Sequence, residues 1–327
     1  MSNILVTGAA GYIGSHFVRR FLNAKSAGQV IAVDNLSVGH RESLPDTERI
    51  HFFENDIGDL EFARSLFRKH DISAVVHFAA SAYVGESQEQ PFKYFDNNVI
   101  GAINLFKAMD EAGVKKIVFS SSCATYGNPN YCPIDEDHPQ KPVSVYGNTK
   151  YIAEKAIQAL ATTGWSYVSL RYFNASGCDD SGEIGESHDP ETHLIPLALQ
   201  TALKKREVLS IFGDDYETED GTCVRDYVHV NDIADAHLLA FDKLESGAKT
   251  EINLGSSVGA SVKQVIDLCK EVSGRDIPVK VCPRRAGDAV ALFADHKRAT
   301  EVIGWTPKYD LRSIIETAWN WESNRKY

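Results

Sequence analysis

Three side chains in the first half of the sequence have the types and spacing needed to remove a proton from an alcohol. Tyr146 and Lys150 are four positions apart, so on a helix both project from the same face. Ser122 ends a run of three serines and precedes the tyrosine by 24 residues. A free tyrosine is a poor base at neutral pH, and lowering its pKa by about 3 units requires roughly 4 kcal/mol. The ammonium group of Lys150 favours the tyrosinate, and Ser122 can hydrogen-bond the reacting oxygen and orient it.

A glycine-rich turn near the start of the chain is the second chemical feature. Gly8, Gly11 and Gly14 stand between a short apolar strand, residues 3–7, and a segment with helical spacing of apolar residues, 12–24. A turn of this kind lets backbone N–H groups and the start of a helix approach a pyrophosphate. A plain tight turn is the alternative for the glycines taken alone. Their place between a strand and a helix favours a dinucleotide site.

The next predicted strand, 29–33, is followed by Asp34, 20 residues after Gly14. A carboxylate at this position hydrogen-bonds the adenosine ribose and repels a 2′-phosphate, which favours NAD over NADP. Asp34 could alternatively only form a turn. The positive charge of an oxidised nicotinamide would act with Lys150 on Tyr146. A Tyr-x-x-x-Lys pair is common by chance, but together with the serine and the glycine turn it indicates dehydrogenase-type chemistry.

The elements that must position these residues alternate between strands and helices. Further strands are predicted at 50–54, 74–78, 116–120 and 167–172, and helices at 59–70, 91–112 and 146–163. This order predicts an α/β fold with a doubly wound parallel sheet of the Rossmann type over residues 1–174. After a loop at 175–192 come short strands (208–212, 250–254, 278–282) and helices (231–244, 262–273, 311–322), the second helix with a Ser261–Gln264 capping box. We expect a smaller mixed α/β substrate lobe over 175–327, with elements of 229–254 returning to the main sheet.

Composition narrows the functional classes. The 327 residues carry a net charge of −11, and the positive side chains are scattered, so neither nucleic acid nor an anionic membrane is an expected partner. The six cysteines form no C-x-x-C pair and are typical of a cytoplasmic protein with reduced thiols. The sequence shows no signal peptide and no apolar run long enough to span a membrane. No metal site is expected.

The sequence resembles the extended short-chain dehydrogenase/reductase family, and within it the 4-epimerases of UDP-hexoses. The resemblance rests on segments in the family's order along nearly the whole chain: TGAAGYIGSH (7–16), VDNLS (33–37), VVHFAA (75–80), DNNVIGA (96–102), FSSSCATYG (119–127), YGNTK (146–150), RYFNASG (171–177), FGDDYETEDGTCVRDYVHVND (212–232) and PRRAGD (283–288). The glycine turn and Tyr-x-x-x-Lys are shared across the superfamily. RYFNASG, EDGTCVRDYVHV and PRRAGD are the specific segments.

The resemblance implies a set of site residues. Its catalytic residues are Ser122, Tyr146 and Lys150. Its cofactor contacts are Gly8, Gly11, Tyr12, Ile13, Gly14, Asp34, Asn35, Ser37, Gly39, Asp56, Ile57, Phe78, Ala79, Ala80, Asn97, Ser120, Tyr146, Lys150 and Phe173. Its substrate contacts are Ser122, Tyr146, Asn174, His193, Leu194, Ile211, Phe212, Arg225, Arg285, Asp288 and Leu292. In this pattern the two arginines clamp the pyrophosphate and Asp288 meets the uridine ribose.

The resemblance also implies a mechanism. Tyr146, assisted by Ser122, takes the proton of the sugar 4-hydroxyl while carbon 4 gives hydride to NAD. A transient 4-keto sugar beside bound NADH then rotates about its pyrophosphate and receives the hydride on its other face. UDP-glucose and UDP-galactose are the implied substrates, with UDP-N-acetylhexosamines possible. NAD is the implied cofactor.

Some positions keep other interpretations open. Arg225 could simply pair with Asp226, and Arg285 could be one of two solvated arginines. Thr192-His193-Leu194 stands where the commonest family pattern has Asn-Asn-Leu, so His193 could bind phosphate or sugar, or belong to the core or cap a loop. The family often has a lysine near position 82, which is Ala82 here. Leu292 either lines the hexose pocket or is structural core.

Two rival functions are considered. A 4,6-dehydratase needs an acid–base pair directly after the active-site serine, whereas Cys123-Ala124 follows Ser122. A non-catalytic NAD-binding protein would not need the Ser122, Tyr146 and Lys150 set. We also expect a homodimer through a four-helix contact, because two predicted helices carry surplus apolar residues. These residues are Val99, Ile100, Ile103, Leu105, Phe106 and Met109 in one helix and Tyr151, Ile152, Ile157 and Leu160 in the other.

Overall fold

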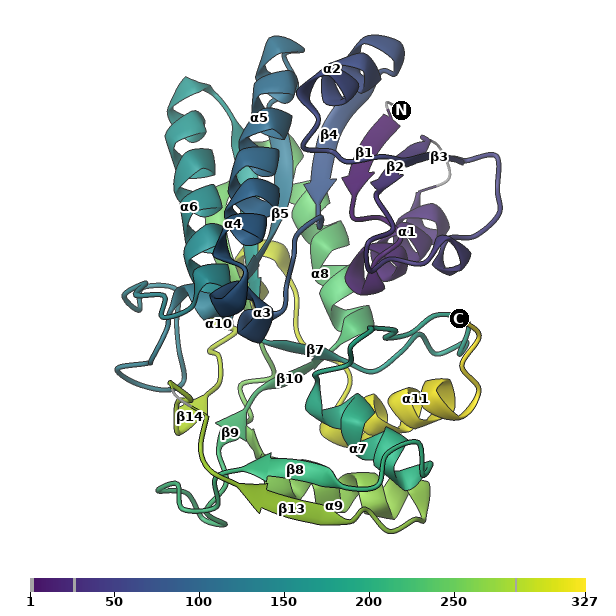
Figure 1. Cartoon of the computed structure of the whole chain (residues 1–327). Helices are drawn as coiled ribbons and strands as arrows, with labels where there is room; N and C mark the ends of the chain where they lie inside the picture. Colours follow the sequence, from purple (N-terminus) through teal and green to yellow (C-terminus); the bar gives the residue numbers. More distant parts are fainter. Residues whose placement is uncertain (1–2, 26–27, 286) are drawn as a thin grey trace. The chain divides into compact units, whose positions relative to one another are not determined.

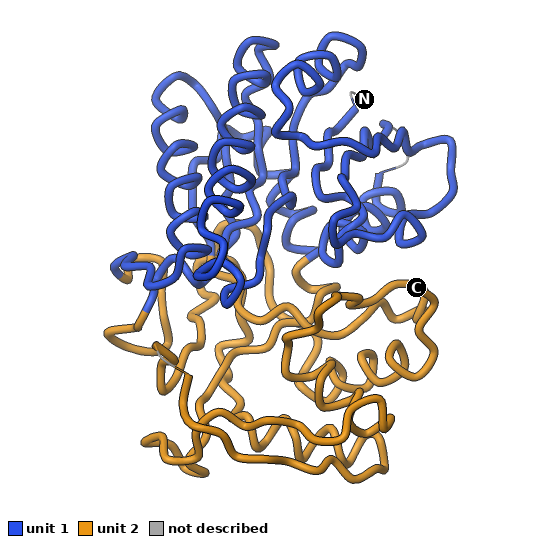
Figure 2. The backbone as a smooth tube through the Cα atoms, in the orientation of Figure 1, with its two compact units in different colours: residues 1–127, 139–171, 234–252 blue, residues 128–138, 172–233, 253–327 orange. Residues whose placement is uncertain are grey.

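The computed structural model describes residues 3–25, 28–285 and 287–327. The chain divides into two compact units, shown in different colours in Figure 2. The first unit contains residues 1–127, 139–171 and 234–252, and the second contains residues 128–138, 172–233 and 253–327. Each unit has a hydrophobic core of its own.

The first unit is built on a seven-stranded sheet with the strand order β11-β6-β5-β4-β1-β2-β3. The strands are β1 (Asn3–Thr7), β2 (Val30–Asp34), β3 (Ile50–Glu54), β4 (Ile72–His77), β5 (Lys116–Ser122), β6 (Ser166–Tyr172) and β11 (Lys249–Leu254). The registered pairs among β1 to β5 are parallel. The predicted Rossmann-type sheet is confirmed, and each predicted strand agrees with the observed one to within about two residues.

Helices cover both faces of this sheet (Figure 1). On one face α2 (Leu60–Lys69), α5 (Ala102–Glu111) and α6 (Val145–Leu160) share a core with the strands, which includes Leu66, Phe106 and Ile157. On the other face α1 (Tyr12–Ala24) packs on α8 (Val230–Lys243), with the Phe21 and Phe241 rings 5.7 Å apart. Burial on both faces explains why the strands are apolar almost throughout.

The helix predicted over 91–112 is interrupted. It consists of α4 (Pro91–Tyr94), a π-helical segment η2 (Phe95–Gly101) and α5, and the short helix α3 (Val84–Glu89) precedes it. The wider turns of η2 turn Asn98 toward the loop after β4, where its amide exchanges hydrogen bonds of 2.8 and 2.9 Å with the backbone of Ser81. The sequence period does not reveal this, because apolar spacing alone does not separate an α-helix from a π-helical segment.

The second unit is a mixed α/β assembly with small sheets. These contain β10 (Tyr227–His229) and β7 (Asn174–Ser176); β12 (Ala260–Ser261), β9 (Val224–Arg225) and β14 (Ala291–Leu292); and β13 (Val279–Cys282) and β8 (Leu209–Phe212). Three helices share its core: α7 (Leu194–Ala202), α9 (Val262–Ser273) and α11 (Leu311–Ser323). The shorter α10 (Lys297–Ile303) completes it. The capping box predicted at the start of α9 is present between Ser261 and Gln264.

Helix α7 was not predicted from the sequence. Its residues, LIPLALQTA, are apolar around most of the helix, and six of the nine are buried. A helix buried on several sides lacks the polar stripe that makes amphipathic helices recognisable. None of the helices in the described ranges is both long enough and apolar enough to cross a membrane.

Candidate functional site

The glycine turn of the first unit joins β1 to α1. Gly8 has a φ of +66°, and a Cβ atom there would lie 2.6 Å from the backbone nitrogen of Ala79. A Cβ at Gly14 would collide with the carbonyl oxygen of Gly8. Both positions therefore require glycine, and Gly11 stands as the N-cap of α1 with no side chain in the way. The start of α1 therefore has the glycine turn that a pyrophosphate site requires.

Asp34 lies at the end of β2, beside this turn. Its carboxylate accepts backbone N–H groups from Ala10 and Leu36, each at 2.9 Å, so it stabilises the turn and the glycine loop together. Burial raises the pKa of Asp34, and the hydrogen bonds from Leu36 and Ala10 oppose that rise. The residues present fit the adenosine side of a dinucleotide: a buried carboxylate with further acceptor capacity, next to a turn that only glycine can form.

The other expected cofactor residues of the first unit follow strand ends. Asn35, Ser37 and Gly39 come after β2, Asp56 and Ile57 after β3, and Phe78, Ala79 and Ala80 after β4, while Tyr12 and Ile13 begin α1 and Asn97 lies in η2. Asn97 donates to Ser81 at 3.1 Å. Phe173 belongs to the second unit. In an open parallel sheet, these strand ends are where ligands bind.

Ser122, Tyr146 and Lys150 all lie in the first unit. Ser122 ends β5, and its hydroxyl accepts the N–H of Ala124 at 3.1 Å. Burial raises the pKa of Tyr146 to about 12, an effect that a hydrogen bond with Ser122 opposes only in part. Burial also lowers the pKa of Lys150 to about 7, and its amine donates to the backbone carbonyl of Ser120 at 2.8 Å.

Burial is thus the largest influence on the pKa of Tyr146 and on the pKa of Lys150. A buried tyrosine and a buried lysine both favour their neutral forms. A cation bound beside Tyr146, such as an oxidised nicotinamide, would lower its pKa and favour the tyrosinate. Ser120, whose side chain is fully buried, supports this arrangement through its carbonyl and through a 2.8 Å hydrogen bond to His237.

Three residues that position Tyr146 were not identified from the sequence. Ser144 caps α6 by accepting the N–H of Gly147 at 3.0 Å, and the hydroxyl of Ser87 accepts the N–H of Tyr146 at 3.1 Å. Asn98 donates to Thr149 at 3.0 Å from the π-helical segment. Ser144 could have been found as an N-cap two residues before the tyrosine. The other two become neighbours only through the fold.

In the second unit, Arg225 and Asp288 come together. Arg225 Nη2 lies 3.4 Å from Asp288 Oδ1, and its Nη1 donates to the carbonyl of Ala289 at 2.9 Å. Asp226 instead accepts N–H groups from Ser256 and Ala294. The observed partner of Arg225 is therefore Asp288, not Asp226. Strand β14 places Leu292 in register with Arg225 on β9, so three expected substrate residues are neighbours.

Arg285 is exposed and stacks on an aromatic ring. Its guanidinium carbon lies 3.9 Å from the centre of the Phe212 ring, at the end of β8 beside Ile211. Arg284 has different partners, forming a 2.7 Å ion pair with Asp215. Asn174, on β7, donates to the backbone carbonyl of Asp226 at 2.7 Å. Arg284 also lies over a ring, that of Tyr216 at 4.1 Å. Among the described residues, the two arginines therefore differ in the ion pair that Arg284 makes with Asp215.

His193 precedes helix α7, which begins at Leu194. Its Nδ1 is 2.7 Å from Glu186 and 3.0 Å from Glu191. Burial would lower the pKa of His193, but Glu186 and Glu191 outweigh it and raise the pKa to about 10. Neither glutamate was singled out from the sequence, because their relation to the histidine is set by a loop and not by a regular period.

With this geometry in place, comparison with known proteins identifies the family. The pattern of the family described as "NAD dependent epimerase/dehydratase family" matches residues 4–255. The chain belongs to this family. A UDP-glucose 4-epimerase from Halalkalibacterium halodurans is 49% identical, over 99% of this chain and 96% of that protein.

Solved structures of the epimerase family agree. The UDP-glucose 4-epimerase from Brucella ovis in complex with NAD has a TM-score of 0.93 at 47% identity, covering 98% of each chain. The UDP-Glc/GlcNAc 4-epimerase from Campylobacter jejuni has a TM-score of 0.87 at 41% identity, covering 99% of this chain and 100% of that chain. The resemblance seen in the sequence motifs is therefore confirmed at the level of the whole chain.

Proposed function

We propose that this epimerase-family chain is an NAD-dependent enzyme that inverts carbon 4 of a UDP-hexose, interconverting UDP-glucose and UDP-galactose. The observation that carries the proposal is the set of Ser122, Tyr146 and Lys150 in the same unit as the glycine turn and Asp34. A proton acceptor and a dinucleotide site in one sheet are what alcohol oxidation requires. Relatives named UDP-glucose 4-epimerase, one of them solved in complex with NAD, support the same activity.

The protein's residues handle the proton. Tyr146 accepts it from the sugar 4-hydroxyl and later returns it, while Ser122 hydrogen-bonds the reacting oxygen. Lys150 is held by the Ser120 carbonyl on the same helix face as Tyr146, and in its protonated form it favours the tyrosinate. NAD, when bound, supplies uptake of the hydride from carbon 4 and its return to the opposite face of the sugar.

The second unit supplies the nucleotide anchor. Arg225 and Arg285 suit the pyrophosphate, because guanidinium groups donate to phosphate oxygens in a fixed fork. Asp288 lies 3.4 Å from Arg225, and in this proposal it accepts from the uridine ribose. Phe212 and Ile211 offer apolar surface to the uracil. Asn174 hydrogen-bonds the phosphates. His193 and Leu194, at the start of α7, also contact the substrate. Holding the nucleotide leaves the hexose free to turn between its two presentations.

The hexose specificity follows from Leu292. A leucine beside Arg225 leaves more room than a tyrosine would, so we propose that UDP-N-acetylglucosamine is also turned over, more slowly than the simple sugars. The Campylobacter jejuni relative is named for activity on both kinds of sugar.

We also propose a cytoplasmic homodimer. The six cysteines are free thiols, which suits a reducing compartment. Of the surplus apolar residues on the two helical segments, Leu105, Phe106, Met109 and Ile157 are buried in the unit's own core. Ile100 and Ile152 are 53% and 37% exposed and remain to be covered. A second copy covering them would form the expected four-helix contact.

The test of the proposed activity uses the purified full-length chain with UDP-galactose and no added reductant. We expect UDP-glucose to accumulate to an equilibrium mixture. A 4,6-dehydratase would instead release a 4-keto-6-deoxy sugar with a carbonyl signal, and a non-catalytic binder would give no product. Either of those two results contradicts the proposal.

A further inference from the structure

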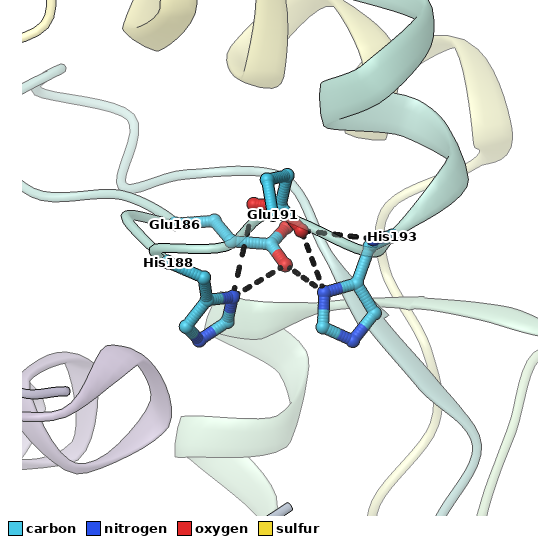
Figure 3. A group of neighbouring side chains, drawn as sticks. All are labelled: Glu186, His188, Glu191 and His193. Atoms are coloured by element: carbon cyan, nitrogen blue, oxygen red, sulfur yellow. Dashed lines mark hydrogen bonds and ion pairs between the residues drawn. The ribbon is translucent and has the colours of Figure 1, made fainter. Parts of the chain in front are cut away.

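Four side chains converge in the loop that leads into α7, and the mechanism uses only one of them. They are Glu186, His188, Glu191 and His193, drawn in Figure 3. Each offers one oxygen or nitrogen atom, and these atoms all lie within 4.8 Å of one another. The spacing is Glu-x-His-x-x-Glu-x-His, so eight consecutive residues supply the whole cluster.

We infer that this cluster is a structural site for a divalent transition-metal ion, with Zn²⁺ the best match. The donor set is two imidazole nitrogens and two carboxylate oxygens, and both are ligand types that Zn²⁺ takes in proteins. No cysteine takes part. Four protein ligands leave no open position, which is characteristic of structural and not of catalytic zinc.

The distances among the donor atoms suit one central ion. His188 Nδ1 lies 3.2 Å from Glu186 Oε1 and 3.7 Å from Glu191 Oε2. His193 Nδ1 lies 2.7 Å from Glu186 Oε1 and 3.0 Å from Glu191 Oε1. Ligands at 2.0–2.2 Å from a tetrahedral zinc are separated by about 3.3–3.6 Å. The two separations of His188 lie within about 0.1 Å of that range, and those of His193 are shorter, at 2.7 and 3.0 Å.

The hydrogen bonding of the two carboxylates supplies a second observation. Their side chains are only 5% exposed. Glu186 Oε1 and Glu191 Oε2 are buried, and within the described ranges they face the Nδ1 atoms of His188 and His193 as ion-pair partners and not in hydrogen-bond geometry. Buried carboxylate oxygens normally accept well-directed hydrogen bonds, because leaving one without any is costly. A cation between the imidazoles and the carboxylates satisfies both oxygens.

The surrounding chain holds the ligands in place. Glu191 Oε1 accepts hydrogen bonds from the backbone N–H groups of Thr192 and His193 at 2.7 and 2.8 Å. The carbonyl of Glu186 accepts from Trp321 at 2.7 Å and from Arg325 at 3.0 Å, both near the C-terminus. An ion here would join these anchored segments and fix the start of α7. Binding through Nδ1 would also keep the proton of His193 on Nε2, making its exposed edge a hydrogen-bond donor.

The first test is metal content and metal-dependent stability of the full-length protein. After chelator treatment and buffer exchange, we expect Zn²⁺ to bind at one ion per chain. At a hundredfold excess over its Kd, Zn²⁺ should raise the melting temperature by roughly 5 °C. His188→Gln should lose both effects. Asp189→Asn, which removes an exposed carboxylate from the same loop without touching the cluster, should retain both.

The second test does not depend on any variant folding. X-ray absorption at the zinc edge of the wild-type protein should show nitrogen and oxygen ligands at about 2.0–2.2 Å with imidazole scattering. Failure of Zn²⁺ to bind or to stabilise the wild-type chain would overturn the inference, leaving a hydrogen-bonded ion-pair cluster. So would sulfur ligands, or unchanged binding by His188→Gln. None of these results bears on the proposed epimerase activity, which is assayed separately.

Discussion

Tyr146 is buried, and the groups around it decide whether it acts as a base. Replacing Tyr146 with Phe removes the hydroxyl and keeps the ring. Loss of a positioned general base should lower turnover by a factor of about 10² to 10⁴. Bound NAD should remain, which the spectrum of cofactor released on denaturation checks. Near-normal turnover would mean that another group takes the proton.

Lys150 predicts a pH dependence of stability. Its pKa in the folded chain, about 7, lies below its ordinary value of 10.5 because of burial. The buried amine therefore lowers the free energy of unfolding by its full amount below pH 7. This destabilisation shrinks as the pH rises from 7 toward 10.5. Relative to the wild type, Lys150→Met should be more stable at pH 6 than at pH 9, as measured by thermal unfolding.

The matched control for Lys150 is Lys155→Met, on the same helix. Lys155 is exposed and bonded to Gln158 at 3.0 Å, so its contribution should not change between the two pH values. The hydrogen bond that Lys150→Met loses to Ser120 is missing at both pH values and cancels in the comparison. A difference between Lys150→Met and wild type that is constant with pH would show that the buried amine is not the titrating group.

Leu292 predicts substrate selectivity. Leu292→Tyr should suppress turnover of UDP-N-acetylglucosamine tenfold to a few hundredfold, since pocket shape of this kind is worth about 1–3 kcal/mol. UDP-galactose should be nearly unaffected, because a steric wall acts on the larger ligand. The measurement is kcat/KM for both sugars. Equal loss on both would place Leu292 in the structural core.

At the scale of elements, the capping box of α9 can be tested directly. Ser261 accepts the N–H of Gln264 at 3.1 Å, and the side chain of Gln264 accepts the N–H of Ser261 at 2.9 Å. Ser261→Ala should lower the free energy of unfolding by about 1 kcal/mol in chemical denaturation. Ser273→Ala, at the other end of the helix, is the control and should cost much less. Equal effects would contradict the role of the cap.

Most of the regular elements were predictable because they have a periodic signal in the sequence. The strands of the first unit and helix α9 follow apolar runs, an amphipathic spacing and a capping pair. Helix α7 lacks such a signal, and the π-helical segment looks like any helix in sequence. The site residues differ in predictability in the same way. Tyr146 and Lys150 belong to one sequence motif and could be predicted together. Arg225 meets Asp288, and His193 meets Glu186, only in the folded chain.

At the scale of the whole molecule, the proposed dimer predicts a monomeric variant. Ile152→Asp places a charge on the exposed apolar surface of α6 and should disrupt association. Sedimentation at micromolar concentration should show a dimer for the wild type and a monomer for the variant. Val258→Asp, at a position 74% exposed in the second unit, should remain dimeric. A monodisperse wild-type monomer rules the dimer out.

The central claim is that hydride leaves carbon 4 and returns to the same carbon within one active site. UDP-galactose carrying deuterium at carbon 4, incubated with the purified protein in ordinary water, tests this most directly. The account predicts UDP-glucose with the deuterium retained at carbon 4, because the label is held on the bound cofactor between the two steps. Loss of the label to solvent, or no UDP-glucose at all, would contradict it.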